Sequence, residues 1–109
     1  MEVRFKNKKI RDLCEKQAVA EKQLGAASAR KLKLRLVALE AAAKVTDLVA
    51  GNPHPLKGDR LGEFALDLAG GWRLVFVPGH DPCPTHLDGS IDWAQVTIVS
   101  IEYIGDYHD

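Results

Sequence analysis

Residues 61–77 read LGEFALDLAGGWRLVFV and carry the strongest structural signal in the chain. Apolar residues alternate with other residues on both sides of the paired glycines: Phe64, Leu66, Leu68, Trp72, Leu74 and Phe76. Alternation with a period of two predicts strands that bury one face, and a Gly-Gly turn between two such runs predicts a β-hairpin. The chain is therefore expected to contain a sheet with one covered face.

Two further strands are predicted, one towards each end of the chain. Residues 2–5, EVRF, alternate, and residues 93–105, WAQVTIVSIEYIG, are rich in β-branched side chains, with Val96, Ile98 and Ile104 as core candidates. Residues 52–60, NPHPLKGDR, contain two prolines and a glycine, which predicts an irregular or edge segment. Residues 78–90, PGHDPCPTHLDGS, consist of turn-forming residues and predict a loop.

Two helices are predicted between the first strand and the hairpin. Asn7 is a good N-cap for a helix over residues 8–23, and Gly25 ends that helix. Residues 27–44 have leucines at helical spacing and form the second helix. The order β-α-α-β-β-β predicts one α+β domain over residues 1–109, a largely antiparallel sheet with a helical hairpin packed on one face.

The net charge of zero hides a strong asymmetry along the chain. Residues 1–60 hold 14 Lys and Arg against 7 Asp and Glu, whereas residues 61–109 hold one cation, Arg73, against 8 acids. Such a split can mark an anion-binding face. Alternatively, helices simply collect Lys and Arg while strands and turns collect Asp, and the sequence does not separate these two interpretations.

Composition gives the expected compartment. No apolar run is long enough to span a membrane, and the first ten residues lack the apolar core of a secretory signal. Cys14 and Cys83 lie far apart in different contexts, so two free thiols in a reducing cytoplasm are expected.

Candidate functional residues begin with the segment HPLKGDR, residues 54–60. His54 is a titratable base near neutral pH, and Lys57 and Arg60 are cations on the same irregular segment. The alternative is an ordinary solvated basic loop. Arg73 points to the opposite face of its strand from Trp72, where it can hold a phosphate bidentately or, equally, pair with a nearby carboxylate such as Glu63 or Asp67.

The chain ends in GDYHD, residues 105–109. His108 can transfer a proton, and Tyr107 can relay one or stack on a base. Chain ends often fray, but this one directly continues a β-branched strand and is therefore expected to be anchored.

A third cluster, His80, Cys83 and His86, contains possible metal ligands. A tetrahedral site needs a fourth ligand, and the chain has no second ligand pair of matching spacing. No metal or other cofactor is therefore predicted, and this segment is interpreted as an insert between strands.

Three parts of the sequence together resemble one family. They are the opening VRFKNKKIRDLCEK, the block HPLKGDRLGEFALDLAGGWRLVFV and the terminal VSIEYIGDYHD. The chain resembles the HigB-type (killer) toxins of the RelE/ParE superfamily of bacterial toxin–antitoxin modules over nearly its whole length. That resemblance implies a small α+β toxin that arrests growth. Such toxins bind the ribosome, cleave messenger RNA without a metal and are held inactive by an antitoxin, usually a helix-turn-helix protein.

The resemblance also implies a set of site residues. The matching catalytic positions are His54, Lys57, Arg73, Asp106, Tyr107 and His108. The two histidines are candidates for the two proton transfers, whose order the sequence leaves open, and Lys57 and Arg73 would stabilise charge on the phosphate. Arg60, Arg30 and Lys33 are expected RNA contacts, with an acidic neighbour as the alternative for Arg60. The last strand is expected to deliver the tail beside the His54 segment.

Two other functions remain open from the sequence. A ParE-like, gyrase-directed inhibitor on the same fold would not need the His, Lys and Arg set. The other alternative is an inactive binding partner in such a module. An antitoxin that binds DNA would need a helix-turn-helix, whereas the two predicted helices lead into a sheet.

Overall fold

The computed structural model describes residues 1–106. Within them, three helices and five strands follow in the order β1 (Glu2–Phe5), α1 (Lys8–Glu15), α2 (Gln17–Leu24), α3 (Ala26–Ala41), β2 (His54–Pro55), β3 (Phe64–Asp67), β4 (Arg73–Pro78) and β5 (Ile98–Gly105). The connections contain three short 3-10 helices, η1 (Val45–Asp47), η2 (Gly58–Arg60) and η3 (Trp93–Gln95).

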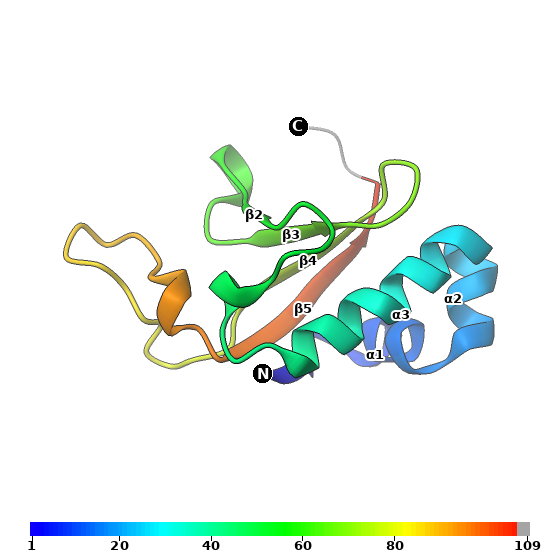
Figure 1. Ribbon diagram of the computed structural model, residues 1–109, viewed down its shortest axis with the longest axis horizontal. Helices are drawn as coiled ribbons and strands as arrows, with labels where there is room; N and C mark the ends of the chain where they lie inside the picture. Colours follow the sequence, from blue (N-terminus) through cyan, green and yellow to red (C-terminus); the bar gives the residue numbers. More distant parts are fainter. Residues whose placement is uncertain (107–109) are drawn as a thin grey trace.

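The strands form one mixed sheet in the order β1-β5-β4-β3-β2. Strand β1 runs parallel to β5, and the other three pairs are antiparallel. Figure 1 shows the helices gathered on one side of this sheet. The predicted α+β architecture, a largely antiparallel sheet with helices on one face, is confirmed.

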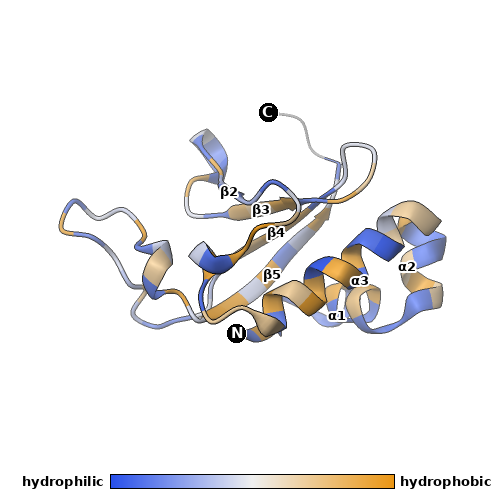
Figure 2. Ribbon diagram, viewed as in Figure 1, coloured by the Kyte–Doolittle hydropathy of each residue, from blue (hydrophilic) through white to orange (hydrophobic). Residues whose placement is uncertain are grey.

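The main core lies between this sheet and the helices. Leu74, Phe76 and Ile101 from the strands and Leu32 and Leu39 from α3 have at most 1% of their surface exposed. Figure 2 shows the corresponding apolar bands along β3, β4 and α3. Burial of these side chains is the main source of stability of a domain of this size.

The hairpin prediction is confirmed, and the structure adds the register of its two strands. Phe64 pairs with Phe76 and Leu66 with Leu74, so the alternating apolar side chains share the helix-facing side. The loop closes with a hydrogen bond from Leu68 N to Trp72 O at 2.8 Å. Gly70 and Gly71 both have positive φ, at 58° and 84°, which explains the paired glycines.

The predicted helix over residues 8–23 is wrong in one respect, because the chain breaks at Lys16 into α1 and α2. Lys16 adopts an extended conformation, with φ −116° and ψ 104°. Helix α1 contacts β1 and β5, whereas α2 packs against α3. One straight helix could not follow both surfaces, so the break is a consequence of tertiary packing.

The predicted strand over residues 93–105 begins five residues late, at Ile98. Trp93 instead starts η3 and packs against the ring of Phe64, with the ring centroids 4.9 Å apart. Val96 is fully buried, as predicted, whereas Ile98 and Ile104 are only partly buried. The stretch before β5 therefore closes the end of the core rather than extending the sheet.

The predicted loop over residues 78–90 forms an excursion that projects from the end of the sheet (Figure 1). Its root is fixed by His80, whose Nε2 accepts hydrogen bonds from the backbone N–H groups of Thr97 at 2.9 Å and Ile98 at 3.2 Å. An imidazole that accepts at Nε2 carries its proton on Nδ1. The excursion is therefore tied to the start of β5.

The basic half of the chain lies mostly in the helical layer. Eight of its 14 cations belong to α1, α2 and α3, including Arg30 and Lys33. This favours the interpretation in which helices collect Lys and Arg over the one in which all of these cations line a single anion-binding face.

Candidate functional site

The candidate site lies on the face of the sheet turned away from the helices, which we call the open face. His54 pairs with Ala65, and Arg73 pairs with Asp67 two residues further along β3. Directly paired residues point to the same side of a sheet, as do residues i and i+2 of one strand. His54, Asp67 and Arg73 therefore share the open face, with their positions about 7 Å apart along β3.

The segment with His54 is held over this face by a small second core. Leu56 is 4% exposed and packs with Ala65, Val75 and Tyr103, apart from the main core. The turn that leads into β2 has positive φ at two consecutive residues, 87° at Gly51 and 50° at Asn52. Glycine and asparagine adopt this conformation most readily, so the local sequence suits the reversal.

His54 has a defined tautomer in this arrangement. Its Nδ1 lies 2.7 Å from the backbone oxygen of Asn52. A carbonyl oxygen can only accept a hydrogen bond, so Nδ1 carries a proton, and in the neutral ring Nε2 is the nitrogen with the lone pair. Nε2 is thus chemically suited to accept a proton from a bound ligand.

Arg73 sits between a carboxylate and a turn. Its Nε lies 3.2 Å from Asp67 Oδ1, and its Nη1 donates to the backbone oxygen of Gly71 at 2.7 Å. The Asp67 Oδ1 atom is fully buried, and its contact is this ion pair rather than a well-aligned hydrogen bond. The contact with Asp67 that the sequence allowed is thereby observed, and phosphate binding by Arg73 remains a prediction.

Arg60 packs on Tyr103 and pairs with Glu63. Its guanidinium carbon lies 5.0 Å from the centre of the Tyr103 ring, a cation–π contact, and its Nη1 lies 3.2 Å from Glu63 Oε1. The acidic neighbour expected as an alternative for Arg60 is therefore present. Lys57 is exposed and immediately precedes η2 on the same segment.

Tyr103 was not predicted as a site residue, and the reason is a β-bulge. Simple alternation from Val99 and Ile101 places Tyr103 on the helix-facing side. The register shifts between Val75 and Phe76, so Val75 pairs with Tyr103 while Phe76 pairs with Ile101. The extra residue in β5 turns Tyr103 to the open face, which no sequence pattern indicated.

The end of β5 runs beside Arg73, because Gly105 is its pairing partner. Asp106 follows and is exposed. Two predicted catalytic residues, Tyr107 and His108, lie outside the described residues.

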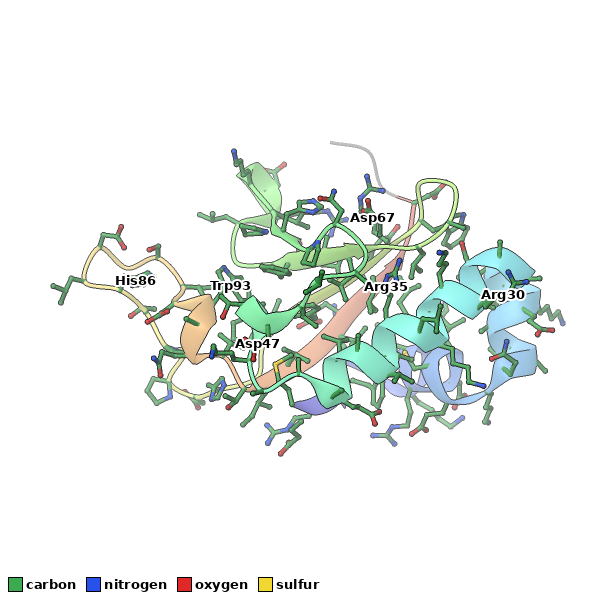
Figure 3. All side chains as sticks on the ribbon, in the orientation of Figure 1. Arg30, Arg35, Asp47, Asp67, His86 and Trp93 are labelled. Carbon is green, nitrogen blue, oxygen red and sulfur yellow. The ribbon has the colours of Figure 1, made fainter. Side chains whose placement is uncertain are left out.

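The expected RNA contacts on α3 belong to the other layer. Arg30 and Lys33 are exposed on the helical side, so they do not share the open face with His54 and Arg73. Figure 3 shows Arg30 well away from Asp67, whereas Arg35 reaches from α3 towards Asp67. Arg30 and Lys33 as RNA contacts stay predictions.

Over residues 1–106, no three or more His, Cys, Asp or Glu side chains gather into a possible metal site. Both cysteines are free. Within the same residues, none of the helices has the length and apolar character to cross a membrane.

Comparison with known proteins shows which known fold this structure is similar to. The sequence matches no protein-family model and none of the curated proteins. The structure is similar to that of a YoeB/ParE toxin from Agrobacterium tumefaciens, with a TM-score of 0.59 and 14% sequence identity over 99% of this chain and 100% of that one. The chain therefore has the RelE/ParE-like toxin fold that its sequence led us to expect.

Proposed function

We propose that this protein is the toxin of a type II toxin–antitoxin module, a ribosome-dependent messenger RNA endonuclease of the HigB type. The observation that carries the proposal is the placement of His54 and Arg73 on one open sheet face, beside the strand end that leads into residues 106–108. The likeness to a toxin fold over nearly the full length agrees with it.

The proposed reaction needs two proton transfers and a cationic phosphate site. His54 Nε2 takes the proton of a ribose 2′-OH as its oxygen attacks the adjacent phosphorus. The bond from phosphorus to the 5′ oxygen of the next nucleotide then breaks, and His108 protonates that oxygen. The products are a cyclic phosphate and a free 5′-hydroxyl, and no metal is required. Arg73 and Lys57 stabilise the charge that develops on the phosphate.

The remaining residues have supporting roles in this proposal. Tyr107 stacks on a base, and Asp106 orients a histidine. Arg60 contacts RNA while its guanidinium keeps the cation–π contact with Tyr103. Arg30 and Lys33 contact ribosomal RNA from the helical layer. The protein works in the cytoplasm, and an antitoxin of the helix-turn-helix type holds it inactive.

The proposal is tested by expressing variants in bacteria without the antitoxin and mapping new RNA 5′ ends. We expect His54→Ala, Arg73→Ala and His108→Ala each to abolish growth arrest and the new 5′-hydroxyl ends, because each removes a group that the reaction requires. His86→Ala, on the excursion, is the matched control and should remain fully toxic. Full toxicity of both Arg73→Ala and His108→Ala would contradict the proposal.

A second function is favoured by one observation, that the similar solved structure is named a YoeB/ParE toxin. A ParE-like inhibitor would bind DNA gyrase without cleaving RNA. Growth arrest with intact messenger RNA and inhibited supercoiling would identify this alternative.

A further inference from the structure

We propose that Arg35 and Asp67 are positioning residues that fix His54 relative to Arg73; the inference rests on the nuclease function proposed above. Neither residue was among the predicted site residues. Arg35 belongs to the helical layer and Asp67 to the open face, so together they connect the two layers at the site.

Asp67 is the centre of this arrangement because it makes four contacts. Its Oδ1 faces Arg73 Nε at 3.2 Å, and its Oδ2 accepts a long hydrogen bond from Asn52 Nδ2 at 3.5 Å. Its backbone N–H donates to Gly51 O at 2.6 Å, and its backbone oxygen accepts from Arg35 Nε at 3.0 Å. One residue therefore contacts both Arg73 and the turn that carries His54.

The side chain of Arg35 packs against the Gly51–Asn52 turn. A Cβ atom built on Gly51 would lie 2.4 Å from Arg35 Nε, so the side chain packs directly against the Gly51 backbone. The same Nε donates to the backbone oxygen of Asp67. Figure 3 shows Arg35 extending from α3 towards Asp67. Helix α3 thus fixes the separation of the Gly51–Asn52 turn and β3.

The Gly51–Asn52 turn positions His54 through a hydrogen bond. The backbone oxygen of Asn52 accepts a hydrogen bond from His54 Nδ1–H, with 2.7 Å between nitrogen and oxygen, and so sets both the tautomer and the direction of the ring. A shift of about 1 Å between reacting groups can lower a rate by about two orders of magnitude. Loss of Arg35 or Asp67 should therefore lower the rate of cleavage more than it weakens RNA binding.

Four variants distinguish a positioning role of Arg35 and Asp67 from an effect of their charges alone. Arg35→Met removes the donor and extends only as far as the position of Arg35 Nε. Arg35→Gln has the same length as Met but places an amide nitrogen, a donor, at that position. Asp67→Asn removes the charge that holds Arg73. Lys31→Met, on the same helix and exposed, is the matched control. Each variant is first shown to have a melting temperature close to that of the wild type.

The main readout is single-turnover cleavage of messenger RNA on programmed ribosomes at increasing protein concentration. We expect Arg35→Met and Asp67→Asn to lower the limiting rate at least tenfold, with the half-saturating concentration changed less than threefold. Arg35→Gln should recover most of the rate, and Lys31→Met should match the wild type. A wild-type or faster rate for Asp67→Asn would overturn the proposal, since Asp67 would then only compete with the substrate for Arg73. Equal losses for Arg35→Met and Arg35→Gln would also overturn it.

A second readout does not depend on cleavage. In ¹H–¹⁵N spectra of the free protein, the Nε–H signal of Arg73 should exchange with water faster in Asp67→Asn and Arg35→Met than in the wild type and Lys31→Met. An unchanged Arg73 signal would overturn the positioning role. Absence of cleavage by the wild-type protein would instead overturn the proposed function and leave this spectral comparison to decide the positioning role.

Discussion

Among single residues, Asn52 combines the most local roles. It adopts φ 50°, a left-handed conformation that asparagine tolerates better than most residues, directly after a glycine at φ 87°. Its backbone oxygen fixes the His54 ring, and its side chain reaches Asp67. A Gly-Asn pair with consecutive positive φ angles is a recognisable turn signal, so the sequence did contain a sign of this reversal.

Among the residues that the structure describes, Cys14 has the largest shift in pKa. Burial raises the pKa of its thiol from 9.0 to about 12, with Glu15 adding to the shift. A raised pKa keeps the thiol protonated, and only the thiolate is a good nucleophile. At pH 8, on the order of one molecule in ten thousand carries the Cys14 thiolate.

We therefore expect Ellman's reagent at pH 8 to modify one thiol per native molecule quickly, that of Cys83, and Cys14 only after unfolding. The thiol count over time, in native buffer and in guanidinium chloride, measures this. Cys83→Ser is the control and should leave almost no fast-reacting thiol in the native protein. Rapid modification of native Cys83→Ser would show that the partial burial of Cys14 does not protect its thiol.

At the scale of elements, the excursion between β4 and β5 shows how an irregular segment can have a fixed root. One imidazole nitrogen of His80 accepts from two successive backbone N–H groups at the start of β5. Further along, Thr85 and Ile91 form an isolated bridge that closes the tip. The glycine, proline and aspartate content predicted the loop, but the histidine anchor follows no local sequence rule.

This anchor predicts a local effect of substitution. His80→Ala leaves the N–H groups of Thr97 and Ile98 without their acceptor, at a cost of about 1 kcal/mol. We expect hydrogen exchange at these two amides to become several-fold faster, while amides in the centre of β4 are unchanged. His86→Ala, in the same excursion, should leave both amides at the wild-type rate. Equal exchange in His80→Ala and the wild type would contradict the anchor.

At the scale of the whole molecule, the two faces of the sheet differ in what covers them. Three helices seal one face over the main core, while the other carries the small cluster around Leu56 and the candidate site. The face with the candidate site is thus supported by the main core, which packs against the opposite face of the same sheet. Arg35 reaches from α3 to the backbone oxygen of Asp67, whose side chain lies at the candidate site.

Core packing should therefore dominate the global stability. Ile101 is completely buried, whereas Leu34 on the outer face of α3 is 53% exposed. We expect Ile101→Ala to lower the free energy of unfolding by about 2–5 kcal/mol, because it removes apolar contacts and leaves a cavity. Leu34→Ala, the matched control, should change it by less than about 0.5 kcal/mol. Urea denaturation measures both, and similar values for the two variants would contradict the described core.

Much of the fold could be predicted from the sequence because its signals are local. The alternation around Gly70 and Gly71 predicted the hairpin, and leucine spacing predicted a helix that corresponds to α3. The break at Lys16 could not be predicted, since Ile10, Leu13 and Ala20 would form one continuous stripe on an unbroken helix. The late start of β5 also depends on packing, because the ring of Trp93 packs against that of Phe64 instead of continuing the strand.

The sequence by itself determined which residue types could perform the chemistry, the strands that carry them and the family they resemble. Only the tertiary structure decided how they meet. Strand order brings His54 and Arg73 onto one face, a bulge turns Tyr103 towards them, and Arg35 arrives from a helix 32 residues before Asp67. Alternation and helical spacing act over a few residues, whereas a site assembled across two layers depends on contacts between segments that are distant in the chain.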